Sequence, residues 1–130
     1  MKVIIAGSRH MPFSQYHLID KAVKLSGWCV TEVVCGMARG ADMMGGKWAY
    51  ENSIPVKKFP ADWDTHGRAA GPIRNSEMRD YADALIVFIW EGSRGSVNML
   101  RQMQDVSKLT CVYFDGEYDP ANSYLYKYLL

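Results

Sequence analysis

Residues 59–96 read FPADWDTHGRAAGPIRNSEMRDYADALIVFIWEGSRGS and contain the features that decide the fold. Residues 84–90 carry no charge and no alternation of polar and apolar side chains, which predicts a strand buried on both faces. Pro72 predicts a helix start, because its missing N–H would have no partner in the first turn. The strand runs into GSRGS at residues 92–96, where a second helix is expected. Glycines and hydroxyls at a helix N-terminus offer backbone N–H groups to an anion.

The rest of the chain repeats this order of apolar run, polar loop and helical pattern. Further strands are predicted at residues 2–6, 28–35, 54–59 and 109–114. Further helices are predicted at residues 15–25, 41–52 and 96–108. Ser14 is expected to cap the first helix, and two lysines in the strand at 54–59 suit a sheet edge. The pattern predicts a single α/β, Rossmann-like domain spanning residues 1–130, with a five-stranded parallel sheet in the order 3-2-1-4-5, flanked by helices. The tail at residues 115–130 fits both a strand and a helix.

Composition narrows the class of protein and its partners. With 130 residues, 48% hydrophobic and 22% charged, the chain is long enough for one globular domain. A net charge of +1 gives no basic surplus, so nucleic acid is an unlikely partner. Neither a signal peptide nor a membrane span is expected, which predicts a cytoplasmic protein. The cysteines and histidines follow no metal-ligand spacing, so neither a metal nor a cofactor is predicted.

The predicted strand order brings three glycine loops to one crevice. The first and fourth strands would be neighbours where the winding reverses, and ligands bind there, beyond the strand C-termini. The loops 7–9, 36–42 and 92–96 each contain an arginine, namely Arg9, Arg39 and Arg94. Backbone N–H groups, hydroxyls and guanidinium groups together suit phosphate or ribose. Neither GxGxxG nor GxxxxGK[ST] is present, and each loop alone is also compatible with a simple chain turn.

Five motifs carry a resemblance to a known family. They are GSR at 7–9, GMARGAD at 36–42, ADW at 61–63, AAGPIRNSEM at 69–78 and GSRGS at 92–96. With these motifs the chain resembles the YspA-like branch of the SLOG superfamily, which is related to the Lonely Guy phosphoribohydrolases and to DprA. The resemblance implies a Rossmann-like crevice for nucleotides or nucleotide-derived ligands. The expected ligand-binding residues are Gly7, Ser8, Arg9, Gly36, Met37, Ala38, Arg39, Gly40, Asp42, Asp62, Trp63, Gly71, Arg74, Asn75, Gly92, Ser93, Arg94, Gly95 and Ser96.

The same resemblance implies that the hydrolase acid is missing. The hydrolase relatives carry an arginine, a methionine four residues later, a strand and then PGGxGTxxE. Arg74 and Met78 match the first part, but the position of the catalytic glutamate falls on Met99, whose thioether cannot ionise. No catalytic residue is therefore assigned. If the protein is an enzyme, Asp62 and Arg74 are the candidates, with the pKa of Asp62 raised by burial beside Trp63; the alternative role of Asp62 is a helix or turn cap.

Four functions follow, in decreasing order of support. The first is binding of a nucleotide or nucleotide-derived metabolite, such as an ADP-ribose-like signal, by a sensor or sequestering domain. The alternative is N-glycosidic cleavage of a nucleoside monophosphate. Binding of DNA and a structural role with a vestigial crevice come next. Gly45 and Gly46 indicate that something approaches the helix closely, and a packed strand or a neighbouring subunit is favoured over a ligand. Together with the tyrosine-rich tail, the two glycines predict a homo-oligomer.

Two side chains have competing interpretations at this stage. Trp63 would either stack on a base or fill the core. Glu77 is expected to pair with Arg74 or Arg101 on helix surfaces.

Overall fold

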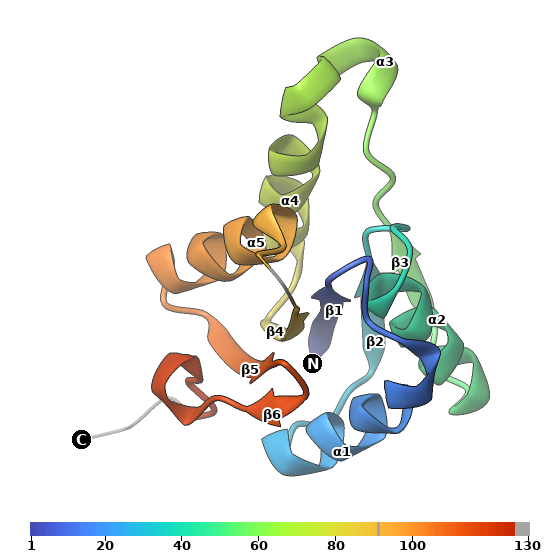
Figure 1. Cartoon of the computed structure of the whole chain (residues 1–130), viewed down its shortest axis with the longest axis vertical. Helices are drawn as coiled ribbons and strands as arrows, with labels where there is room; N and C mark the ends of the chain where they lie inside the picture. Colours follow the sequence, from blue (N-terminus) through green and yellow to red (C-terminus); the bar gives the residue numbers. More distant parts are fainter. Residues whose placement is uncertain (91, 127–130) are drawn as a thin grey trace.

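The computed structural model describes residues 1–90 and 92–126, and Figure 1 shows a central sheet between two layers of helices. The strands are β1 (Lys2–Gly7), β2 (Glu32–Cys35), β3 (Val56–Lys58), β4 (Ala84–Ile89), β5 (Leu109–Phe114) and β6 (Glu117–Tyr118). The α-helices are α1 (His17–Ser26), α2 (Ala41–Glu51), α3 (Trp63–His66), α4 (Ala70–Tyr81) and α5 (Arg94–Asp105). Short 3-10 helices are η1 (Phe13–Gln15), η2 (Gly67–Ala69) and η3 (Pro120–Asn122).

The sheet has the order β3-β2-β1-β4-β5-β6. Strands β1 to β5 pair in parallel, which confirms the predicted class and the order 3-2-1-4-5. The prediction of five strands was one short, because β6 folds back on β5 as an antiparallel strand. Asp115 and Gly116 make this turn possible by adopting positive φ values of 50° and 85°. Beyond it Tyr124 exchanges two backbone hydrogen bonds with Thr110, so the described end of the tail is extended, and residues 127–130 lie outside the described part.

The two faces of the sheet bury different side chains. Val3 and Ile5 of β1 pack in the cluster that includes residues of α1 and α2, and Ile4 packs in the cluster that includes residues of α4 and α5. Every residue of β4 is buried, which confirms the prediction of a strand covered on both faces. The switch in helix layer therefore falls between β1 and β4, and the loops after these two strands open at the same edge of the sheet.

Two predicted boundaries were wrong for local reasons. Ser14 does not cap α1, because Pro12 precedes a 3-10 turn that contains Ser14, and α1 begins at His17. The second strand begins at Glu32 rather than at residue 28. Trp28 lies in the preceding loop, where its indole N–H donates to the carbonyl of Leu125 in the C-terminal tail at 3.0 Å. Trp28 therefore contacts the C-terminal tail and does not contribute to a strand.

Gly45 has a packing role in α2. A Cβ atom there would lie 2.6 Å from Cγ2 of Ile5, so only a glycine lets the helix lie this close to β1. Beyond its chain neighbours and the backbone of α2 itself, none of the described residues has an atom within 4 Å of a Cβ placed on Gly46. The packed-strand interpretation is confirmed for Gly45, since β1 is the neighbour.

The connection from β3 to α4 forms an arm, defined as residues 62–69. Figure 1 shows this arm projecting from the body of the domain at the top of the view. All eight of its residues are exposed. None of the helices in the described ranges has the length and apolar character that a membrane crossing needs.

Candidate functional site

Three of the glycines expected to contact a ligand are needed for packing of the loops themselves. A Cβ on Gly7 would lie 2.2 Å from the carbonyl oxygen of Phe88. One on Gly40 would lie 2.3 Å from the carbonyl oxygen of Ser8. One on Gly36 would also collide, at 2.8 Å from a carboxylate oxygen of the side chain that joins the loops. These glycines let the loops after β1 and β2 lie against each other and against the end of β4.

The carboxylate that joins these loops belongs to Asp42, in the first turn of α2. It accepts the N–H of Gly7 at 3.2 Å and the N–H of Ala38 at 3.3 Å, and the residue is only 5% exposed. Burial raises the pKa of Asp42 to about 6, although the nearby Arg74 guanidinium and the two N–H groups act in the opposite direction. Both oxygens are already used by the backbone, so Asp42 holds the crevice together from inside its wall.

Arg74 and Asn75 connect this wall to α5. Arg74 donates through Nη1 to the carbonyl of Gly36 and through Nε to Oδ1 of Asn75 at 3.1 Å. The buried amide of Asn75 donates to the carbonyl of Gly95 at 3.2 Å and to Oδ1 of Asn98 at 3.0 Å. Asn75 therefore positions the N-terminus of α5, and Asn98, which sequence analysis missed, is its partner.

The N-terminus of α5 is the most open part of the crevice. Ser93 is the N-cap residue, and its hydroxyl lies 2.8 Å from that of Ser96 without accepting a backbone N–H. Apart from the chain neighbours of each glycine, no heavy atom of the described residues lies within 4 Å of a Cβ placed on Gly92 or Gly95. Among the described residues, none accepts the N–H of Arg94, Gly95 or Ser96. Residues 92–96 thus form the open, N–H-rich turn that the sequence predicted.

Two adjoining clefts lie over these loops. The first, about 900 Å³, runs from the loop after β1 across α4 and along α5. The second, about 670 Å³, lies over the loop after β2 and the residues before the arm. Both are lined by Arg9, His10, Ala38, Trp63 and Arg74. All three predicted turns contribute to the first cleft, the turn at residues 36–42 through Ala38 and Asp42. Arg94 lines the first cleft, Arg39 lines the second, and Arg9 lines both.

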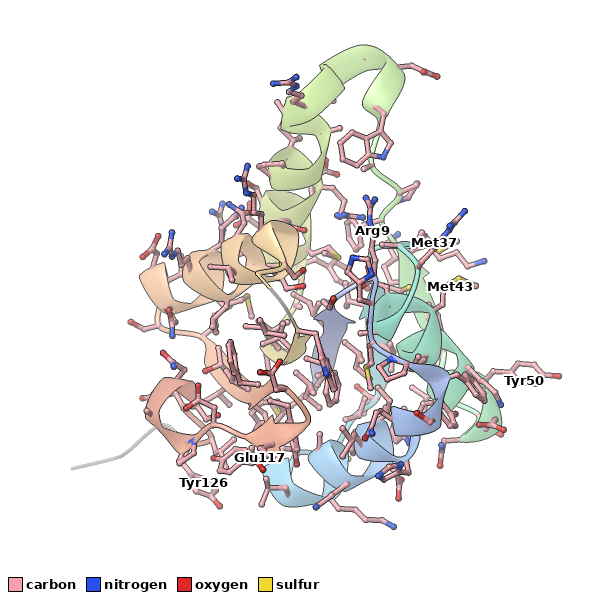
Figure 2. All side chains as sticks on the ribbon, in the orientation of Figure 1. Arg9, Met37, Met43, Tyr50, Glu117 and Tyr126 are labelled. Carbon is pink, nitrogen blue, oxygen red and sulfur yellow. The ribbon has the colours of Figure 1, made fainter. Side chains whose placement is uncertain are left out.

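Arginine is concentrated in these clefts to an unusual degree. The chain has seven arginines, and six of them line a cleft: Arg9, Arg68, Arg74, Arg94 and Arg101 in the first, and Arg9, Arg39 and Arg74 in the second. Arg79 is the exception. No described lysine lines either cleft, and Asp42 is the sole described carboxylate among the lining residues. Figure 2 shows Arg9 above the end of β1, between the helices α4 and α5 on one side and the loop carrying Met37 on the other.

Two of the expected ligand contacts, Ser8 and Asp62, make side-chain hydrogen bonds within the protein itself. Ser8 lines the first cleft but is completely buried, and its hydroxyl accepts the N–H of His10 at 3.0 Å, so its contact with a ligand stays a prediction. Asp62 lines neither cleft. It caps the arm helix by accepting the N–H of Thr65 at 3.1 Å, and this hydrogen bond lowers the pKa of Asp62. The expected rise in the pKa of Asp62 was wrong because the carboxyl is exposed, and the cap interpretation is confirmed.

Trp63 does not fill the core. It is 51% exposed and lines both clefts, with its ring edge 3.5 Å from the place a Cβ would occupy on Gly71. The flat side chain therefore stands at the mouth of the crevice, beside the start of α4. Of the two interpretations, packing in the core is excluded.

The cleft contains residues that the sequence analysis did not single out. They are His10, Arg68, Asn98 and Arg101. His10 follows Arg9 directly, and Arg101 comes seven residues after Arg94, which is two helical turns, so both could have been found by extending the motifs. Glu77 forms no ion pair with Arg74 or Arg101 within the described residues, which overturns that expectation.

Comparisons with known proteins agree with the architecture. The Gene 61 protein of Mycobacterium phage D29 is 37% identical over 78 residues, which are 55% of this chain and 62% of that protein. DNA processing protein A (DprA) from Streptococcus pneumoniae has a similar fold, with a TM-score of 0.70 at 16% identity over 85% of this chain and 49% of that one. The chain thus spans less than two thirds of either relative. Residues 1–66 match YAcAr, the YspA, cpYpsA-related SLOG family, and with half of its length matched the chain belongs to that family.

Proposed function

We propose that the protein binds a nucleotide or a nucleotide-derived metabolite through its phosphate groups, as a sensor or sequestering domain. The observation that carries the proposal is the segregation of the basic residues, with six of the seven arginines lining the two clefts and the described lysines lying elsewhere. Arginine offers a planar fork of donors that matches phosphate oxygens in pairs, whereas lysine offers a point charge. A surface that merely needed solubility would not sort the two cations in this way.

The turn at residues 92–96 supports a phosphate at a defined place. The N–H groups of Arg94, Gly95 and Ser96 are unused by the described residues, and the space beside Gly92 and Gly95 is open. The positive end of the α5 dipole favours an anion there. Arg9 and Arg94 line the same cleft and would balance the charge of one phosphate.

Trp63 supports a ligand that also carries a ring. It is exposed, lies at the junction of both clefts, and has no core to fill. Stacking of a base on such a side chain contributes about 1–3 kcal/mol. Membership of the SLOG family agrees with a nucleotide-related ligand.

A thermal-shift series with AMP, ADP, ADP-ribose, NAD and cyclic nucleotides tests the proposal. A ligand at 100 times its Kd adds about 2.7 kcal/mol to the free energy of unfolding, which is a shift of several degrees. Arg94→Gln should reduce the shift, and Lys24→Gln on α1 serves as a control of equal charge change. If no nucleotide raises the melting temperature at millimolar concentration, the proposal fails.

Hydrolysis of an N-glycosidic bond stays the second candidate, and the structure changes the residue that would carry it. The carboxyl in the cleft wall with a raised pKa, about 6, is Asp42 and not Asp62. A carboxyl that is partly protonated near neutral pH suits a general acid, and to protonate a substrate Asp42 would have to release one of its two backbone hydrogen bonds. Incubation of the protein with AMP and CMP, followed by chromatography for the free base, tests this. Activity that survives in Asp42→Asn would remove Asp42 from consideration.

Self-association stays a prediction as well. Met43 and Tyr50 on α2 are exposed and, as Figure 2 shows, lie on the outer side of the domain, away from the sheet. Light scattering at two protein concentrations measures the oligomeric state directly, and a monomer at both would refute the prediction.

A further inference from the structure

The first cleft extends well beyond the turn at residues 92–96. Arg101 lines its outer end and follows Arg94 by seven residues on α5. At 1.5 Å per residue the two positions are about 10 Å apart along the helix and on the same face. Arg68, on η2 in the arm, lines the same cleft. One phosphate group held at the start of α5 cannot also contact the outer pair.

The Arg101 guanidinium forms no ion pair with Asp105, the carboxylate one turn later on α5. Asp105 lies at i+4, the spacing at which Lys24 pairs with Asp20 at 2.7 Å and Lys47 pairs with Glu51 at 2.9 Å. No described carboxylate lies within 4 Å of the Arg101 guanidinium. The same holds for Arg68. Both guanidinium groups are exposed, line the same cleft and have no described counterion, so an anion bound in this part of the cleft would be attracted to them.

The charge of the cleft exceeds what a monophosphate needs. A phosphate monoester carries about −1.5 to −2 at neutral pH. Arg9 and Arg94 already match that charge beside the turn, and Arg74 donates to the carbonyl of Gly36. Arg68 and Arg101 are therefore surplus unless the ligand has more charge.

We propose that Arg68 and Arg101 form a second phosphate subsite, so that the ligand of this domain carries at least two phosphate groups. This rests on the proposed function and specifies the ligand class. Two kinds of ligand could place a second phosphate at the outer end of the cleft. One is a nucleotide with a chain of phosphates, and the other is a nucleoside with separate phosphates at two positions. AMP fills only the inner subsite.

Isothermal titration calorimetry at fixed ionic strength tests the proposal with AMP, ADP, ATP and adenosine 3′,5′-bisphosphate. The second phosphate is expected to raise affinity at least about tenfold over AMP, since a hydrogen bond to a charged group contributes at least that much. Arg68→Gln and Arg101→Gln should each remove most of this gain and leave the affinity for AMP within about twofold. Lys24→Gln is the control for the lost charge. Preference for ATP or for the bisphosphate tells which source of the second phosphate fits.

The outcomes separate the two proposals. If AMP binds as tightly as all three ligands with more phosphates, the second subsite is refuted and the proposed function stands. If Arg101→Gln and Arg68→Gln weaken AMP as much as the others, both side chains serve the inner phosphate, and the inference fails. If none of the four compounds binds, the proposed function fails and the second subsite fails with it.

Discussion

Replacing Gly45 by alanine tests the close approach of α2 to the sheet. The new Cβ would lie 2.6 Å from Cγ2 of Ile5, about 1 Å inside the optimal carbon–carbon distance. Ile5 is completely buried on β1, which pairs with a strand on each side, so it has little room to move. Overpacking of this kind costs roughly 1–3 kcal/mol, offset by about 1 kcal/mol from the better helix propensity of alanine. The free energy of unfolding should therefore fall by up to about 2 kcal/mol.

Gly46→Ala is the matched control, because the same change one residue later meets no atom within 4 Å. Helix propensity alone should raise its stability by roughly 0.5–1 kcal/mol. Urea unfolding followed by circular dichroism measures both variants. At about 4 °C per kcal/mol for a chain of this size, the melting temperature of Gly46→Ala should exceed that of Gly45→Ala by about 2–12 °C. If Gly45→Ala is as stable as Gly46→Ala, the packing argument is wrong.

Three further predictions concern the site. The pKa of Asp42 is raised from 3.8 to about 6 in the folded protein, so the folded state binds a proton more tightly than the unfolded state, and this contribution to stability is lost as pH rises through 6. Relative to Asp42→Asn, the natural protein should therefore lose about 1 kcal/mol of unfolding free energy between pH 5 and 7, measured by urea unfolding. Parallel pH curves for the two proteins would contradict the raised pKa. Trp63→Ala should change the free energy of unfolding by less than about 1 kcal/mol and weaken nucleotide binding by at least about fivefold in calorimetry, whereas a large loss of stability would show that the ring packs in the core. Asn75→Ala removes the hydrogen bonds from α4 to the carbonyl of Gly95 and to Oδ1 of Asn98, which keeps only its bond from Gln102, so the change should cost about 1–3 kcal/mol in thermal unfolding. An unchanged melting temperature would mean that the Asn75 amide does not fix the start of α5.

Much of the fold was predictable because its signals are local. The uncharged run in β4 indicates burial on both faces, and the Gly–Pro pair in the first turn of α4 indicates a helix start. The parallel order follows from the alternation of strands with helices. The strand β6 was not predictable in the same way. Its two residues lie in a tail whose extended form depends on pairing with β5, which no local pattern expresses.

The site shows the same division between local and tertiary information. The turn at residues 92–96 was recognisable from glycine and serine alone. The roles of Gly7 and Ser8 were not, because a glycine that admits a ligand and one that admits a neighbouring loop look identical in sequence. The sequence predicted a raised pKa for Asp62, whereas the carboxyl with the raised pKa is Asp42. The sequence could not distinguish them, because the desolvation of Asp42 depends on the packing of α2 against the loops.

The two borders of the sheet have a consequence for the behaviour of the protein in concentrated solution. At one border β3 is only three residues long and ends in two exposed lysines, and at the other β6 has two residues followed by Pro120 in η3. Short, charged or proline-terminated margins give an incoming chain few backbone groups to hydrogen-bond. Growth of the sheet from one molecule into the next is thereby discouraged at both ends, so any assembly of this protein would have to use its helices or loops.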